Sequence, residues 1–452
     1  MPQRHLHSPR LTAITILDRL EQTRQPVKML LDRETTRRPL PARERGLIME
    51  IVYGVLRHRQ SLDRIVELVS TTRLDKLDPL IHQALRVGLY QLFHLDRIPS
   101  RAAVNETVES CKAAGKPKRL QGFANAILRE ALRRQEDLAV AAATDRFGQT
   151  ILNHPEWLVN RWRKRFGEAE TRRICASNNR LPSLVLRQNN LVDGKDTLQQ
   201  MLAARGITSL AGTYSPDAIC IPHFSGSITQ LPGYPEGLFL VQDEAAQLTT
   251  PLLGPFRQGG RYLDACAGLG GKTSHLLQFA GAWQLQIDAV EPEQSRRDKL
   301  GDNLVRLFGT ASAKIHPVRL ETLKESHLSA FDGILVDAPC SGTGVTGRHP
   351  DIRWNRREED LLRYQEEQLA LLHHAFGMLC PGGVLVYATC SLEREENEEV
   401  VARFLTAHRA MSLTDCTPYL PPAAHHLVAD GFFSPHPDET IDGFFAARMQ
   451  RC

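Results

Sequence analysis

The chain has 452 residues, of which 42% are hydrophobic and 24% charged, a composition typical of a soluble globular protein with two or three domains. No apolar run approaches the ~20 residues of a membrane span, and the N-terminus lacks the apolar core of a secretory signal, so we expect a cytoplasmic protein that has no membrane segment. The net charge of +4 is uneven, since residues 1–150 carry +9 and the remainder carries −5, which indicates either a polyanionic partner for the N-terminal third or an ordinary solvated surface.

The first 145 residues show helical periodicity and no strand-like alternation. Ser8 followed by Pro9 predicts a helix start, because a serine hydroxyl caps free N–H groups and proline suits the first helical turn. Apolar residues recur with the period of an α-helix in residues 11–20, 43–69 and 79–95. We therefore predict an all-α domain over residues 1–145.

The segment 101–129, RAAVNETVESCKAAGKPKRLQGFANAILR, resembles the helical RNA-binding domain of the transcription antitermination factor NusB. The resemblance implies a loop over residues 115–119 between two helices. Its cations Lys116, Lys118 and Arg119 are candidates for phosphate contacts, and a solubilising loop is the alternative.

Residues 146–235 are expected to form a small α+β module, of the ferredoxin or RRM type, that binds RNA. Residues 154–167, HPEWLVNRWRKRFG, predict a basic amphipathic helix whose two tryptophans belong to the core. Residues 183–240 then alternate short strands with one helix, and the Pro- and Gly-rich residues 231–237 indicate a boundary.

Strands alternate with helices from about residue 238 onward, a pattern that predicts a doubly wound parallel sheet in an α/β Rossmann-like domain over residues 236–452. Residues 442–449, DGFFAARM, look like a late strand added to this sheet. Ligands of such sheets bind at the carboxyl ends of the strands. The candidate site residues follow three of these strands.

The first strand runs into a glycine-rich loop composed of Cys266, Ala267, Gly268, Leu269, Gly270, Gly271 and Lys272. A P-loop would need glycine where Cys266 stands, and the G-x-G-x-x-G of a dinucleotide fold is absent. S-adenosylmethionine is the third candidate, because a helix N-terminus behind such a loop favours a negatively charged group. Glu291 closes the second strand ~20 residues later, where a carboxylate can bind ribose hydroxyls. An exposed surface charge is the alternative for Glu291.

Two further strands end in thiols. ILVDAPC brings Asp337 and Cys340 to the sheet edge, and VLVYATC brings Cys390. Neighbouring strands lie ~4.8 Å apart, so both thiols can face one small site if these strands are adjacent. A cysteine is by default a small buried hydrophobe, and zinc binding is a second alternative for the pair. No metal-ligand spacing with a histidine supports zinc, and no metal is expected.

This set of groups suits methylation of cytosine. Carbon 5 of cytosine is a poor nucleophile, and addition of a thiolate to carbon 6 makes carbon 5 enamine-like. A carboxyl group that hydrogen-bonds ring nitrogen 3 stabilises the addition. A second thiol or a base can then assist loss of the carbon 5 proton.

The motifs DAPCSGTGVTGRHPDIRW and YATCS resemble those of the Sun/Fmu family of RNA 5-methylcytosine methyltransferases, and the resemblance covers nearly the whole chain. It implies Cys390 as the nucleophile and Cys340 as the thiol that helps to release product. It also implies that S-adenosylmethionine is held by the loop, by Glu291 and by Asp337. The implied substrate is small-subunit ribosomal RNA before full assembly of the subunit, and we expect a monomer.

Two departures from the family and one rival remain. Gly268 and Leu269 stand where the family usually has Ala-Pro, and no Asp follows the third strand, so no residue is assigned to the adenine. Residues 348–354, RHPDIRW, could contact phosphate and stack a base, or form a structural loop. The rival is a non-catalytic RNA-binding or antitermination-type protein that kept a methyltransferase fold. The complete set of Asp337, Cys340 and Cys390 weighs against it.

Overall fold

The computed structural model describes residues 8–37, 40–192, 195–222, 224–310, 312–323 and 331–452. They form two compact units. The first comprises the chain up to Asn179 together with His349–Arg356, and the second comprises Arg180–Arg348 and Arg357–Cys452.

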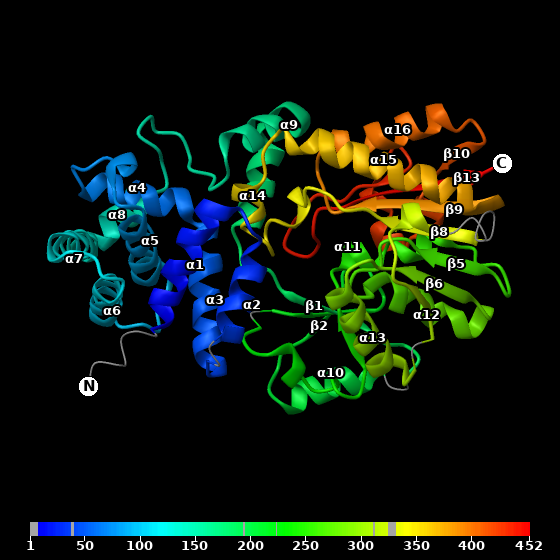
Figure 1. Ribbon diagram of the computed structural model, residues 1–452, viewed down its shortest axis with the longest axis horizontal. Coiled ribbons are helices and arrows are strands. Elements are labelled where there is room, and N and C mark those ends of the chain that lie inside the picture. The colour runs from blue at the N-terminus through cyan, green and yellow to red at the C-terminus, as the bar shows by residue number, and fades with distance from the viewer. Residues whose placement is uncertain (1–7, 38–39, 193–194, 223, 311, 324–330) are drawn as a thin grey trace. The chain divides into compact units, whose positions relative to one another are not determined.

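The first unit is helical, as predicted (Figure 1). Its described helices are α1 (Pro9–Thr23), α2 (Val27–Arg37), α3 (Ala42–Arg57), α4 (Arg59–Val69), α5 (Pro79–His94), α6 (Ser100–Ala113), α7 (Lys118–Arg133), α8 (Gln135–Ala141), α9 (Glu156–Asn178) and the short α14 (Ile352–Asn355). The Ser8 hydroxyl accepts a hydrogen bond from Leu11 N–H at 3.1 Å, which confirms the predicted start of α1. Within the described part of residues 1–145, no strand forms beyond an isolated bridge that starts at Thr144.

One apolar core joins helices α1 to α8 and contains buried residues from each of them. The crossing of α3 and α5 depends on Gly54, because a Cβ there would lie 1.9 Å from the Tyr90 ring. Of the two tryptophans in α9, Trp162 is fully buried, as predicted, and Trp157 is half-buried.

The second unit begins with a four-stranded antiparallel sheet in the order β2-β3-β1-β4. Its elements are β1 (Leu184–Gln188), α10 (Lys195–Ala204), β2 (Leu210–Ala211), β3 (Ala218–Ile221) and β4 (Phe239–Val241). Strand β4 pairs with β1, so the sheet extends beyond the Pro- and Gly-rich residues 231–237. The predicted α+β module is therefore confirmed as a fold, and its sheet ends at Val241.

The second sheet of this unit is mixed, in the order β11-β12-β13-β9-β8-β5-β6-β7, and β10 pairs with β13. Its strands are β5 (Arg261–Asp264), β6 (Gln286–Val290), β7 (Lys314–His316), β8 (Phe331–Asp337), β9 (Leu379–Thr389), β10 (Met411–Thr414), β11 (Val428–Ala429), β12 (Phe432–Phe433) and β13 (Phe445–Arg451). Strands β5 to β9 are parallel, whereas β13 lies antiparallel to β9. The late strand predicted at residues 442–449 is thus confirmed as β13.

Helices cover both faces of this sheet (Figure 1). They are α11 (Glu244–Gln247), α12 (Gly271–Trp283), α13 (Gln294–Phe308), α15 (Asp360–Met378) and α16 (Glu398–Ala407). Leu335 of β8 packs with residues of α12 and α13, while its neighbours Ile334 and Val336 pack with α15 and α16. This alternation is what a strand buried on both faces produces. The strand order reverses between β5 and β8, so the loops after these two strands open into the crevice where such folds bind ligands.

Candidate active site

The predicted strand ends come together in the second unit. β8 pairs in parallel with β5 on one side and with β9 on the other. Asp337 is in register with Ala388, so the loop that carries Cys340 lies beside the loop that carries Cys390. The adjacency on which the thiol prediction depended is therefore confirmed.

The glycine-rich loop connects β5 to the N-terminus of α12, and the buried carboxylate of Asp264 binds both ends of it. Asp264 accepts hydrogen bonds from the Thr273 hydroxyl at 2.7 Å and from Cys266 N–H at 3.4 Å. Burial raises the pKa of Asp264 to about 6 despite these bonds. The loop is thus fastened to both the strand before it and the helix after it.

The glycines of this loop serve different purposes. Gly270 has φ +87°, and a Cβ there would lie 2.4 Å from Leu300 Cδ1 of α13, so its missing side chain admits the neighbouring helix. Gly268 has φ +56° and nothing within 4 Å of a Cβ position, so open space lies above it. The loop therefore offers a space beside the first N–H groups of α12, which suits a ligand with a negatively charged end.

Glu291 directly follows β6 and is only 4% exposed. Its carboxylate accepts Glu293 N–H at 2.8 Å. Since β6 pairs with β5, this carboxylate lies one strand away from the glycine loop. A buried acid at this position fits a ligand that carries hydroxyl groups.

Lys272 and Asp337 form an ion pair with an Nζ to Oδ2 distance of 2.6 Å. The lysine is buried, and its ammonium also lies 5.4 Å from the centroid of the Phe444 ring. The pair fixes the direction of the Asp337 carboxylate at the end of β8. It also joins the last residue of β8 to the glycine-rich loop.

The thiols of Cys340 and Cys390 lie 3.3 Å apart. Both residues are half-buried. The pKa of the Cys340 thiol is raised well above its usual value, first by the hydrogen bond with Cys390 and then by burial.

Three family models match the chain. Residues 7–133 match the NusB family, residues 154–225 match the ferredoxin-like domain of RsmF/B-like methyltransferases, and residues 252–450 match the 16S rRNA methyltransferase RsmB/F family. A ribosomal RNA small subunit methyltransferase B of Citrobacter koseri is 34% identical over 407 residues, which are 90% of this chain and 91% of the relative.

The chain belongs to the RsmB/F family of 16S rRNA methyltransferases, which use S-adenosylmethionine.

Another relative spans the chain almost completely. A probable ribosomal RNA small subunit methyltransferase B of Synechocystis is 33% identical and covers 98% of this chain and 99% of its own length. The crystal structure of PH0851 has the same fold over 98% of this chain and 99% of its own, with a TM-score of 0.76 and 24% identity. The NusB-like region that the residues of the first unit predicted is therefore confirmed, and so is the methyltransferase fold.

Two buried residues that hold the site were not predicted. Arg187 of β1 donates to the Gly271 carbonyl and to the Ser274 hydroxyl, each at 2.6 Å, and so holds the first turn of α12. Glu396 contacts both thiol loops. Arg187 lies in an apolar strand ~80 residues before the loop, and no local pattern links the two segments. Glu396 lies in the acidic run EREENEE, which is typical of a solvent-exposed surface.

The segment 348–354 is held by bonds within the protein, which favours the structural loop over the alternative of contacts with phosphate and a base. Arg348 forms ion pairs with Asp243 and Asp442. In the first unit, Arg353 is fully buried and donates to the Asn153 and Asn178 carbonyls. The Trp354 indole N–H donates to the Leu56 carbonyl at 2.7 Å, and the Arg59 guanidinium lies over its ring.

The cations of the loop before α7 differ in environment. Lys116 is paired with Asp78 at 2.8 Å, whereas Lys118 and Arg119 are exposed in the first turn of α7. Cations are unfavourable at a helix N-terminus, and no acidic residue stands in this turn. Lys118 and Arg119 are therefore the more accessible of the three candidates for phosphate contacts.

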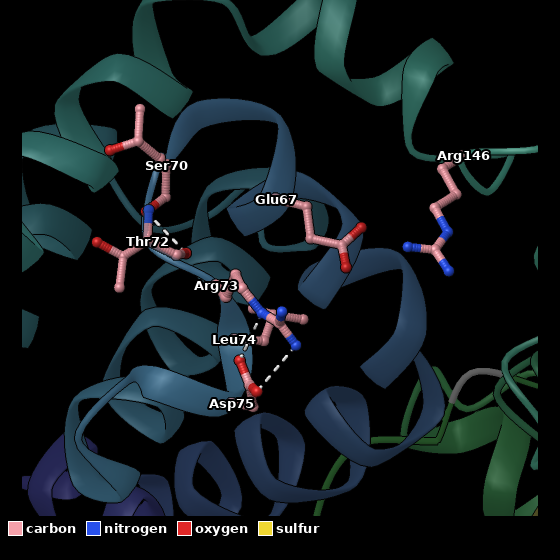
Figure 2. A pocket seen from close by; sticks show the side chains of 8 residues that line it. Glu67, Ser70, Thr72, Arg73, Leu74, Asp75 and Arg146 are labelled. Atoms are coloured by element: carbon pink, nitrogen blue, oxygen red, sulfur yellow. Dashed lines mark hydrogen bonds and ion pairs between the residues drawn. The ribbon is translucent and has the colours of Figure 1, made fainter.

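A surface pocket of the first unit is a poor candidate for the active site (Figure 2). Arg73, which lines it, is bound to Asp75 through two hydrogen bonds of 3.0 and 3.1 Å. Across the described ranges of the chain, no cluster of three or more His, Cys, Asp or Glu could hold a metal ion. None of the helices in those ranges is long and apolar enough to cross a membrane.

Proposed function

We propose that this protein methylates carbon 5 of a cytosine in 16S rRNA through a covalent intermediate with Cys390. The observation that carries the proposal is the 3.3 Å approach of Cys340 and Cys390 beside Asp337, which Lys272 holds. Two thiols and a carboxylate at one strand-end crevice match the needs of this reaction better than those of other methyl transfers. Membership of the RsmB/F family supports the same conclusion.

The chemistry begins at Cys390. Its thiolate adds to carbon 6 of the cytosine, a C–S bond forms, and the electron pair of the C5–C6 double bond becomes available at carbon 5. As the ring gains electrons, nitrogen 3 takes up a proton from solvent, and we assign the Asp337 carboxylate to accept the resulting N–H and so to stabilise the ring. The bond from Lys272 limits the directions that this carboxylate can take, which supports the assignment.

Bound S-adenosylmethionine supplies the methyl group. We assign its binding to the loop from Cys266 to Lys272, to Glu291 and to Asp337. The open space above Gly268 and the buried carboxylate of Glu291 fit its amino-acid end and its ribose hydroxyls, respectively.

Product release needs the second thiol. The C–H bond at carbon 5 breaks, and its electrons restore the C5–C6 double bond and expel the Cys390 thiolate from carbon 6. The proton passes to Cys340, once deprotonated, or to a base that Cys340 assists. The proximity of the two sulfur atoms is consistent with one thiol attacking while the other serves release.

We further propose that residues 1–145 and 146–235 bind the RNA and that 236–452 performs catalysis. The target cytosine must leave its stack to reach the thiols, which favours RNA before the small subunit is fully assembled. The protein would act in the cytoplasm as a monomer without a metal ion. The rival, an RNA-binding protein without activity, has no use for a paired set of thiols.

Bisulfite sequencing tests the proposal. Purified protein, S-adenosylmethionine and unmodified 16S rRNA should yield one new protected cytosine, and omission of the methyl donor is the control. RNA that stays unprotected at every cytosine, or a methyl group found on another base, would contradict the proposed reaction.

A further inference from the structure

The two thiol-bearing loops share one buried carboxylate, that of Glu396. Ser341 follows Cys340 in the chain, and its N–H donates to Glu396 Oε1 at 2.7 Å. Ser391 follows Cys390, and its hydroxyl donates to Glu396 Oε2 at 2.5 Å. The Ser341 hydroxyl donates to the same Oε2. The residue that follows each cysteine therefore donates hydrogen bonds to the same carboxylate, that of Glu396.

A glutamine completes this arrangement. Gln368 of α15 donates from Nε2 to Glu396 Oε1 at 3.1 Å and to the Pro339 carbonyl at 3.0 Å. Pro339 directly precedes Cys340, so the Cys340 loop is held on both sides of its thiol. The Glu396 side chain has no solvent exposure, and these donors are what compensates for the burial of its carboxylate.

The main chain next to Glu396 also belongs to this arrangement. The Tyr387 hydroxyl donates to the Glu396 carbonyl at 2.5 Å, and Tyr387 lies in β9, three residues before Cys390. Asn397 donates from Nδ2 to the Ser391 carbonyl at 2.9 Å. Glu396 is thus fixed to the strand that carries Cys390, and through its carboxylate it reaches across to the loop that carries Cys340.

We propose that Glu396 is a positioning residue that sets the distance between the two thiols. The reason for such a role rests on the proposed function. Attack by one thiol and release by the other require both thiols to face the same pyrimidine ring. The reacting atoms themselves are not touched by Glu396. Its loss should let the Cys340 loop move away from Cys390 while the cofactor loop, which Glu396 does not contact, keeps its shape.

The test measures the thiol pair directly. Diamide oxidises two neighbouring thiols to a disulfide and takes up their two hydrogen atoms, and mass spectrometry of the cleaved protein quantifies the Cys340–Cys390 pair among all cysteines. In the full-length protein, Glu396→Ala should slow formation of this disulfide by about tenfold or more, since the variant has none of the hydrogen bonds that the Glu396 side chain makes to the two thiol-bearing loops. Affinity for S-adenosylhomocysteine should stay within about twofold of wild type, as expected for independent sites.

Two variants control this experiment. Glu396→Gln should restore most of the cross-linking rate, because its amide can accept from Ser341 N–H and donate to the serine hydroxyls. Glu244→Ala is the matched control, since Glu244 is equally buried and holds Thr213 N–H and Ser215 N–H of another loop. It should lower the melting temperature and leave the thiol cross-link unchanged.

A wild-type rate of cross-linking in Glu396→Ala would overturn the proposal. If that variant does not fold, the double variant Ser341→Ala with Ser391→Ala removes both hydroxyl donors and should also slow the reaction. The outcome is separable from the proposed function. A slowed cross-link in a protein that makes no 5-methylcytosine would leave the positioning role standing and reject the activity.

Discussion

At the residue scale, the site depends on two carboxylates, each of which is held by a polar side chain of the glycine-rich loop or of the helix that follows it. Lys272 with Asp337 and Thr273 with Asp264 each join the cofactor loop to a strand end, with bonds of 2.6 and 2.7 Å. The cysteines, Asp337 and the glycine loop could be predicted because each directly follows a recognisable strand. Glu396 could not, because its burial arises only when the chain folds back over two loops.

Asp264 should make stability depend on pH in a way that one substitution reveals. Burial raises its pKa from 3.8 to about 6, so the folded protein favours the protonated acid. The stability that this group contributes is present below pH 4 and is lost as the pH rises through 6, by about 3 kcal/mol in all. Asp264→Asn lacks this loss, so its melting temperature should rise relative to wild type between pH 4 and pH 7. A difference that is constant with pH would show that Asp264 ionises freely in the fold.

At the element scale, helices and the longer strands could be predicted from local patterns, whereas the shortest antiparallel strands could not. β11 and β12 have two residues each, too short for a pattern. The α+β module was predicted as a separate part, yet its strand β1 provides Arg187, which binds the first turn of α12. Contacts of this kind join segments ~80 residues apart and leave no local signal.

Arg187→Met should therefore weaken cofactor binding although Arg187 lies outside the methyltransferase strands. The Gly271 carbonyl would keep only the Ser274 hydroxyl as a side-chain donor, at 3.0 Å, and the Ser274 hydroxyl would lose the guanidinium donor. We expect affinity for S-adenosylhomocysteine to fall about tenfold in calorimetry. Arg448→Met is the matched control. Arg448 is also a buried strand arginine that donates to carbonyls, those of Leu252 and Gly254. It should lower the melting temperature alone, and an equal drop in affinity in both variants would reject a specific role for Arg187.

At the scale of the whole molecule, the uneven charge fits a division of labour. Residues 1–150 carry a net charge of +9, and the helical unit that contains them matches the NusB family over residues 7–133. Composition alone left two alternatives open, a polyanionic partner or an ordinary solvated surface. Among the cations that the sequence analysis considered for phosphate contacts, Lys118 and Arg119 are exposed at the start of α7, whereas Arg348 and Arg353 are bound within the protein.

Replacing Lys118 and Arg119 together by alanine should weaken RNA binding and reduce its salt dependence. Each phosphate that the protein no longer neutralises should lower the slope of log K against log salt by about 0.7 to 0.9, so we expect a reduction of about 1 to 2. Filter binding at several salt concentrations measures it. Arg363→Ala, at an exposed arginine of α15 paired with Glu367, is the control and should leave the slope unchanged. An unchanged slope in the double variant would place the RNA elsewhere.

The most direct test of the whole account is covalent trapping of RNA by the two cysteine variants. Cys340→Ala keeps the attacking thiol and impairs release, so it should accumulate a protein–RNA adduct that migrates slowly on a denaturing gel. Cys390→Ala and the double variant should form none, because attack precedes release. An adduct in Cys390→Ala but not in Cys340→Ala would show that the roles are exchanged, and two unstable variants without adduct would contradict a catalytic thiol pair.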